Sequence, residues 1–182
     1  MVNTICVFGS SSPEAGSADY QEALELGARL ARAGFAVCSG GYYGAMEAVS
    51  RGAREAGGRT IGMTTPFYRL APNAFLDETI EIPRWQDRLF AMVEKGDGYV
   101  LLKGGTGTLL ELSAVWECLN KRALDGRPCV AMHFWKPVLE TVRAVERQRA
   151  GRRWEEFGEG LIRLAATPEE AVEYLRYNIR HE

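Results

Sequence analysis

Short apolar segments alternate with amphipathic segments along this chain, and no other feature of the sequence limits its fold so strongly. The apolar segments at residues 4–10, 35–41 and 59–63 have the length of β-strands, and the segments between them, 17–34 and 44–58, have the periodicity of helices. Short strands separated by helices favour a parallel sheet with helices on both faces and right-handed crossovers. The alternation therefore predicts an α/β fold.

The second half of the chain continues the same pattern. Strands are expected at residues 79–82, 98–102, 127–134 and 161–166, and helices at 84–96, 107–124, about 137–148 and 167–179. A long loop, residues 64–78, stands between the third and fourth strands. No internal repeat or low-complexity linker divides the chain. We expect a single Rossmann-like three-layer domain over residues 1–182, with a mostly parallel sheet and helices on both faces.

The composition argues against several classes of function. A net charge of -2, with no block of Lys and Arg, gives no reason to expect nucleic-acid binding. The apolar stretches fall short of the roughly 20 residues that a membrane span needs, and no secretory signal pattern is present. The four cysteines, Cys6, Cys38, Cys118 and Cys129, are not spaced as metal ligands, and most stand in apolar strands as small hydrophobes. We expect a cytoplasmic protein, and we predict no metal and no cofactor.

Unusual turns follow three of the expected strands: residues 7–13 (VFGSSSP), 39–46 (SGGYYGAM) and 103–111 (KGGTGTLLE). In a parallel sheet these turns lie along one edge, where ligands bind at the point of strand-order reversal. Glycines let the backbone approach an anion, and the first N–H groups of a helix attract phosphate. Neither glycine turn is a usual GxGxxG or Walker A motif. The glycines alone leave two interpretations open, a phosphate site or tight packing of helix on sheet.

The turn KGGTGTLLE resembles the PGGxGTxxE signature of the Lonely Guy family, cytokinin-activating phosphoribohydrolases long labelled possible lysine decarboxylases. Residues 7–63 are similar to the first half of that family, including its GGGxxGLMG-like turn, and Arg88 stands at the spacing of its active-site arginine. The resemblance covers most of residues 3–135. It implies a homodimer or higher homo-oligomer that hydrolyses the N-glycosidic bond of a nucleoside 5′-monophosphate, with an AMP-like substrate expected. The products would be a free base and ribose 5-phosphate.

The resemblance also implies catalytic roles for Glu111, which would face the ribose, and for Arg88, which would contact the substrate. Cleavage builds positive charge on the ribose, so a nearby carboxylate stabilises the transition state and can orient or deprotonate water. An Arg fork binds phosphate or stabilises the departing base. The residues expected to bind substrate or phosphate are Gly104, Gly105, Thr106, Gly107, Thr108, Gly40, Gly41, Gly44, Met46, Ser10 and Lys103.

The chain departs from the family pattern at three positions in these turns. Lys103 replaces the proline of the signature, and Ser39 and Glu47 replace the first and last glycines of the other turn. Lys103 is expected either in solvent or on the phosphate. Glu47 is expected to face solvent on its helix.

Other side chains have both a functional and a structural interpretation. Aromatic residues of the turns and of the long loop would stack on a base or fix the loop to the core: Tyr42, Tyr43, Phe67, Tyr68 and Phe75. Arg84 would join the site or remain a solvated charge, and His133 is expected to be structural. An apolar helix face with Leu112, Trp116 and Leu119 would form a dimer interface or pack on the sheet.

Three functions remain to be compared. The leading hypothesis is the phosphoribohydrolase, and the alternative is a non-catalytic carrier of a nucleotide or of the molybdenum cofactor, built on the same fold. The old decarboxylase label requires a Schiff-base lysine in a cofactor-sized site, and the chain lacks the extent of the usual decarboxylase folds. The decarboxylase is therefore the weakest of the three.

Overall fold

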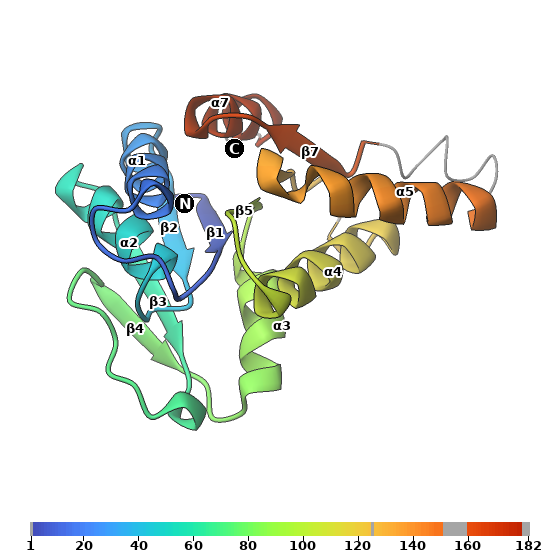
Figure 1. The fold of residues 1–182 in the computed structure, drawn as a ribbon. Helices are drawn as coiled ribbons and strands as arrows, with labels where there is room; N and C mark the ends of the chain where they lie inside the picture. Colours follow the sequence, from blue (N-terminus) through green and yellow to red (C-terminus); the bar gives the residue numbers. More distant parts are fainter. Residues whose placement is uncertain (1, 125, 151–159, 180–182) are drawn as a thin grey trace.

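The computed structural model describes residues 2–124, 126–150 and 160–179, which form one sheet with helices on both faces (Figure 1). The strands are β1 (Thr4–Phe8), β2 (Ala36–Ser39), β3 (Thr60–Thr64), β4 (Glu78–Glu81), β5 (Gly98–Leu101), β6 (Cys129–Met132) and β7 (Ile162–Ala165). The helices are α1 (Ala18–Arg32), α2 (Ala45–Glu55), α3 (Trp85–Lys95), α4 (Thr106–Asn120), α5 (Lys136–Ala150) and α7 (Pro168–Asn178), with the short 3-10 helices η1 (Pro66–Tyr68) and η2 (His133–Trp135). Within these residues no helix is long and apolar enough to cross a membrane. The predicted α/β class is confirmed.

The sheet is parallel throughout, in the order β4-β3-β2-β1-β5-β6-β7. From β1 the chain moves outward through β2 and β3 to β4. It then returns through α3 to β5, on the other side of β1, and moves outward again to β7. The strand order therefore reverses between β1 and β5, and a parallel sheet opens a crevice at the carboxyl ends of such a pair.

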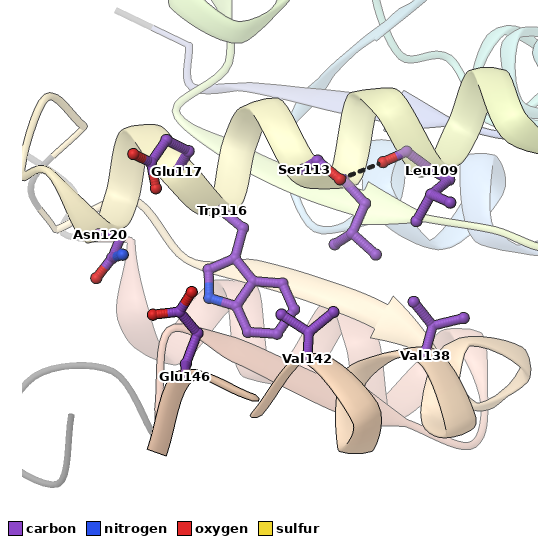
Figure 2. A pocket seen from close by; sticks show the side chains of 9 residues that line it. Leu109, Ser113, Trp116, Glu117, Asn120, Val138, Val142 and Glu146 are labelled. Atoms are coloured by element: carbon purple, nitrogen blue, oxygen red, sulfur yellow. Dashed lines mark hydrogen bonds between the residues drawn. The ribbon is translucent and has the colours of Figure 1, made fainter. Parts of the chain in front are cut away.

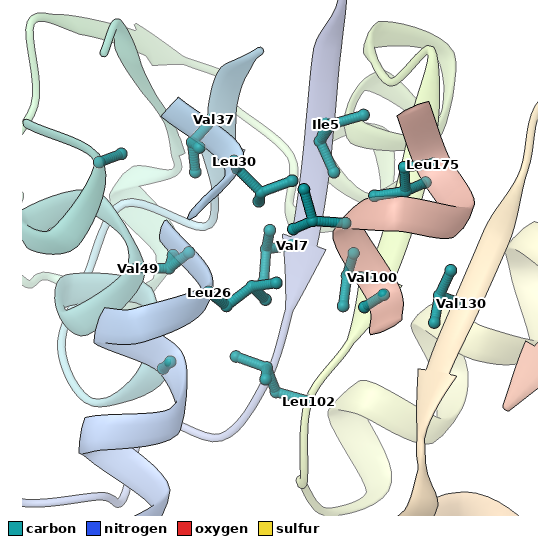
Figure 3. Close-up of a cluster of buried hydrophobic side chains, with 14 of the residues drawn as sticks. Ile5, Val7, Leu26, Leu30, Val37, Val49, Val100, Leu102, Val130 and Leu175 are labelled. Atoms are coloured by element: carbon teal, nitrogen blue, oxygen red, sulfur yellow. The ribbon is translucent and has the colours of Figure 1, made fainter. Parts of the chain in front are cut away.

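One face of the sheet is covered by α1, α2 and α7. Figure 3 shows Leu26 and Leu30 of α1 and Leu175 of α7 gathered around Val7 of β1 and Val100 of β5. These side chains are buried, and the central strands carry apolar residues toward both faces, as buried parallel strands do. Burial of this apolar surface is the main favourable contribution to folding.

The opposite face is covered by α3, α4 and α5. Met92 of α3, Leu112 of α4 and Leu139 of α5 belong to the buried cluster on this side. Cys6 and Cys129 are also buried here as free thiols. Burial raises the pKa of the Cys129 thiol, so this group stays neutral and packs as a small hydrophobe.

Helices α1 and α2 lie unusually close together because each presents a glycine to the backbone of the other. A Cβ atom on Gly27 of α1 would overlap the carbonyl oxygen of Val49, and one on Gly52 of α2 would overlap that of Leu24. Only glycine permits this approach. The close packing of α1 on α2 fixes the start of α2 relative to the turn that leads from β1 into α1.

The element boundaries differ from the sequence prediction most clearly after β6. The strand was expected to continue to residue 134, but β6 ends at Met132 and η2 follows. The indole of Trp135 is buried, and its Nε1 donates a hydrogen bond to the carbonyl oxygen of Leu102, 2.8 Å away. The chain therefore turns inward at this point, an effect of a distant partner that a local pattern does not reveal.

Replacing Gly52 by Ala tests the close approach of α1 and α2. In an open helix position this change stabilises by roughly 1 kcal/mol, because Ala has the higher helix propensity. Here we expect a destabilisation of about 1–3 kcal/mol, since the new methyl group would force the two backbones apart. Urea unfolding followed by circular dichroism measures the change.

Gly160→Ala is the control, because a Cβ at that position meets no atom of the described residues within 4 Å. Its stability should stay within about 0.5 kcal/mol of the parent protein. A Gly52→Ala variant as stable as this control would contradict the packing described above.

Candidate functional site

The turns after β1, β2 and β5 meet at the point of strand-order reversal. The backbone N–H of Ser10 donates to the carbonyl oxygen of Lys103 (3.2 Å), and the carbonyl oxygen of Ser10 accepts from the N–H of Ala45 (2.9 Å). Gly44 has a φ of 67°, and a Cβ there would overlap the backbone of Ser10 and Ser11. Gly44 is therefore required both by its left-handed conformation and by the close approach of the first turn.

A cavity of about 390 Å³ opens where these turns meet. Its walls are formed by Gly9, Ser10, Ser11, Ser12, Tyr42, Met46, Tyr68, Leu70, Arg88, Gly105, Thr106, Gly107, Thr108 and Glu111. Its volume lies within the usual range of small-molecule sites, about 300–1,000 Å³. Most of the residues proposed from the sequence thus line one cavity. Gly40, Gly41 and Gly44 lie in the turn behind its wall, and Lys103 and Gly104 face a neighbouring cavity.

The start of α4 is open toward this cavity. Gly105 is the N-cap residue and has no side chain with which to bond the first N–H groups of the helix. A Cβ on Gly105 or Gly107 would meet no atom of the described residues within 4 Å, so both positions border open space at the start of the helix. Gly104 is different, because a Cβ there would overlap the side chain of Thr108. The first turn of α4 can therefore receive an anion through its exposed N–H groups and its partial positive charge.

Arg88 projects from α3 into the cavity and is buried, with 8% of its surface exposed. Its Nε donates to the carbonyl oxygen of Met63, and one terminal nitrogen donates to that of Gly40 at 2.9 Å. The guanidinium also lies 5.7 Å from the ring centre of Tyr42 and 5.9 Å from that of Tyr68. These contacts hold the charge in one place, as bonds to carbonyls and aromatic faces do.

Gly40 makes room for this arginine. A Cβ at Gly40 would overlap both the guanidinium of Arg88 and the sulfur of Met46. The glycine of this turn is thus needed for the arginine as well as for the turn itself.

Glu111 stands one turn into α4 and is half-buried in the same cavity. Burial raises the pKa of its carboxyl group to about 8, and the positive charge of Arg88 opposes this rise. Loss of water around the carboxylate therefore outweighs the attraction of the arginine. A carboxyl group that changes its charge near neutral pH is suited to proton transfer.

The long loop between β3 and β4 forms part of the cavity and is fixed to the second turn. The Tyr42 hydroxyl donates to the carbonyl oxygen of Thr65 (2.7 Å) and accepts from its N–H (2.8 Å). Asn73 is buried, and its side chain donates to the carbonyl oxygen of Tyr42 (2.9 Å). This attachment brings Tyr68 and Leu70 to the cavity wall.

Sequence reasoning did not propose Asn73 or Leu70. Both stand in a loop that follows a strand at the ligand-binding edge, and this position is the one signal that would have pointed to them. Asn73 contacts Tyr42, and Leu70 lines the cavity together with residues of other turns. These contacts join residues that stand far apart in the sequence.

Several other candidates lie away from the cavity. Lys103 forms an ion pair with Asp19 (2.9 Å). Glu47 was expected in solvent, but it is half-buried and accepts a hydrogen bond from the Tyr20 hydroxyl (2.9 Å). Arg84 is exposed and pairs with Asp87 at 3.7 Å. His133 is exposed, and Phe75 lies beneath the guanidinium of Arg51.

A separate cavity of about 240 Å³ lies between α4 and α5 (Figure 2). Figure 2 shows Trp116 of α4 pointing toward Val142 of α5, while Ser113 bonds the carbonyl oxygen of Leu109 on its own helix. Leu112, Trp116 and Leu119 are buried in the core on this side, which is the structural alternative for this helix face. The walls of this cavity are mainly apolar, and it lacks the arginine and open helix start of the first one.

The chain is similar to known proteins in sequence and in fold. The SLOG cluster4 family model matches residues 2–132. A cytokinin riboside 5′-monophosphate phosphoribohydrolase of Mycobacterium tuberculosis is 36% identical over 117 residues, which are 62% of either chain. A probable cytokinin riboside 5′-monophosphate phosphoribohydrolase of Oryza sativa subsp. japonica is 31% identical over 98% of this chain and 74% of its own.

The molybdenum cofactor binding protein of Rippkaea orientalis superposes on this chain with a TM-score of 0.79 at 23% identity, over 99% of both chains. This likeness shows the fold. The sequence matches confirm the resemblance to the Lonely Guy family, and they span 62% of the length of the first two relatives.

Replacing Glu111 by Gln tests the environment of this carboxyl group through stability. Its pKa is higher in the folded protein than the ordinary value of 4.5, so the folded state holds the proton more tightly. Wild-type stability therefore decreases as the pH rises from the ordinary pKa to about 8, whereas Gln does not titrate. Above that range we expect the variant to unfold at a temperature at least about 2–4 °C higher, equivalent to about 1 kcal/mol.

At low pH, where both states are protonated, the difference should disappear. Glu117→Gln on the same helix removes an exposed carboxylate and should change stability by less than about 1 kcal/mol at any pH. Thermal unfolding over a pH series measures both variants. A constant offset for Glu111→Gln would show that its carboxyl group is not desolvated.

Proposed function

Because the chain belongs to the SLOG cluster4 family, we propose that it is a phosphoribohydrolase acting on a nucleoside 5′-monophosphate. The observation that carries the proposal is that Arg88, Glu111 and the open start of α4 share one cavity. The open helix start would bind the 5′-phosphate, and the ribose would then lie near Glu111. The relatives named as phosphoribohydrolases support the same reaction.

The reaction requires a water molecule, a carboxylate and a stabilised leaving base. Water oxygen attacks C1′ of the ribose, the C1′–N bond breaks, and its electron pair leaves with the base nitrogen. The Glu111 carboxylate would stabilise the positive charge that develops on the ribose and accept a proton from water. The base nitrogen would take a proton from solvent, and Glu111 would release its own proton to solvent after the base leaves. Arg88, held by Met63 and Gly40, would supply a fixed positive charge to the substrate.

The base would lie beside the long loop, against Tyr68 and Leu70 at the cavity wall. Tyr42 is less available for stacking, because it is buried beneath Arg88 and its hydroxyl bonds Thr65. We propose an AMP-like substrate, a homodimer or higher homo-oligomer, and a cytoplasmic location. The four free cysteines suit a reducing compartment. We also propose that the chain works as a single domain without a metal or cofactor.

A non-catalytic carrier of a phosphorylated ligand is the second candidate, favoured by Lys103 and its adjoining cavity. It would use the same open helix start without turning the ligand over. The decarboxylase interpretation receives no support, because the described residues that line the cavity include no lysine to form a Schiff base.

The first experiment measures free base by chromatography after incubation of AMP, GMP, CMP and UMP with the protein. We expect wild type to release base from at least one of these nucleotides. Glu111→Gln should lower kcat at least about 100-fold, as loss of an acid–base group commonly does. Glu117→Gln serves as the control on the same helix and should retain activity. Binding of an intact nucleotide without release of base would instead favour the carrier.

The pH dependence of kcat/KM provides a second test, since it reports the ionisation of the free enzyme. Because the carboxylate form of Glu111 is required, kcat/KM should rise with pH and level off above about 8. Between about pH 6.5 and 9.5 this rise is separable from ionisation of the substrate phosphate near pH 6. A profile that falls over this range would assign Glu111 to the protonated form in the rate-limiting step.

A further inference from the structure

A second cavity, of about 420 Å³, adjoins the site at the start of α4. The two cavities share Ser10 and Ser12, and consecutive residues, Gly104 and Gly105, face one cavity each. The open start of α4 therefore lies between the two cavities. The first contains Arg88 and Glu111, and the second contains the side chains described next.

The second cavity combines one cation, two carboxylates and an exposed aromatic ring. Lys103 lies 2.9 Å from Asp19 and 5.8 Å from the ring centre of Phe134. Glu14 also lines this cavity, and Phe134 has 49% of its surface exposed. A large apolar residue is thus about half exposed beside charged groups, and its ring also packs edge-to-face against Trp135.

These groups match the parts of a sugar that is joined to a phosphate. An ammonium group binds a phosphoryl oxygen, carboxylates accept hydrogen bonds from hydroxyl groups, and an aromatic face packs against the apolar face of a ring. A terminal phosphate alone suits the cavity less well. It would carry about two negative charges toward Asp19 and Glu14, and a half-buried Glu22 also lies near Lys103.

Resting on the proposed function, we propose that the ligand class of this site extends from nucleoside 5′-monophosphates, which fill the first cavity, to nucleoside 5′-diphosphate sugars, which fill both cavities. The first phosphate of a diphosphate sugar binds at the start of α4, and its second phosphate binds Lys103. The sugar occupies the second cavity against Phe134, with Asp19 and Glu14 as acceptors for its hydroxyl groups. The nucleoside lies in the first cavity. Each phosphate of such a diester carries about one negative charge, which the neighbouring carboxylates tolerate better than two.

Isothermal titration calorimetry with the full chain tests this assignment, using AMP, ADP and ADP-glucose as probes. The Glu111→Gln protein is used throughout because its turnover of any probe should be at least about 100-fold slower. We expect ADP-glucose to bind at least about tenfold more tightly than AMP, which corresponds to about 1.4 kcal/mol. ADP should gain less than ADP-glucose, because it lacks the sugar.

Phe134→Ala, added to the same protein, should reduce the ratio of ADP-glucose to AMP affinity to about twofold or less. Lys103→Ala should reduce the same ratio. Lys121→Ala is the matched control, since Lys121 is also exposed and paired with a carboxylate, at the far end of α4. It should leave the ratio unchanged.

The outcomes separate this proposal from the proposed function. Equal affinities for AMP and ADP-glucose, or an unchanged ratio in Phe134→Ala, would overturn the extended site even where wild type hydrolyses AMP. A strong preference for ADP-glucose that Phe134→Ala abolishes would support it even where wild type releases no base. If none of the three probes binds, the extended site fails, and the proposed function then depends on release of base from GMP, CMP or UMP.

Discussion

Two backbone hydrogen bonds at Ser10 hold together the turns on which the whole site depends. Ser10 donates to the carbonyl oxygen of Lys103 after β5 and accepts from the N–H of Ala45 at the start of α2. These bonds need no particular side chain at Ser10, but they need Gly44, whose missing side chain lets the first turn approach. The parallel sheet brings the three turns to one edge, and these bonds set their spacing.

The site contains two charged or ionisable groups that are buried or half-buried, a kind of feature that usually lowers the stability of a folded protein. Arg88 is a buried cation held by carbonyl groups and aromatic rings, and Glu111 carries a carboxyl group whose ionisation is opposed by burial. Both groups would gain stabilisation from a ligand with an anion and a developing positive charge. This arrangement is typical of sites that trade folding free energy for binding and catalysis.

Much of the fold could be predicted from the sequence because its signals are local. Apolar periodicity located the strands and helices, and Thr167 with Glu170 caps α7. The end of β6 could not be predicted, because Trp135 turns inward to bond Leu102, which lies on another strand end. The prediction that Glu47 faces solvent was wrong for a related reason, because its hydrogen-bond partner Tyr20 belongs to a neighbouring helix.

The sequence by itself determined the alternation of strands and helices, the glycine turns and the family to which they belong. Only the tertiary structure decided that Arg88 donates a hydrogen bond to the carbonyl oxygen of Gly40. It also decided that Asn73 binds the long loop to Tyr42. Lys103 lines a second cavity together with Asp19, its ion-pair partner. The physical reason is the distance along the chain over which each interaction acts. Periodicity and turn chemistry act between residues that are close in sequence. The burial of a side chain, the charges near it and the space around it depend on residues that folding brings from distant parts of the chain.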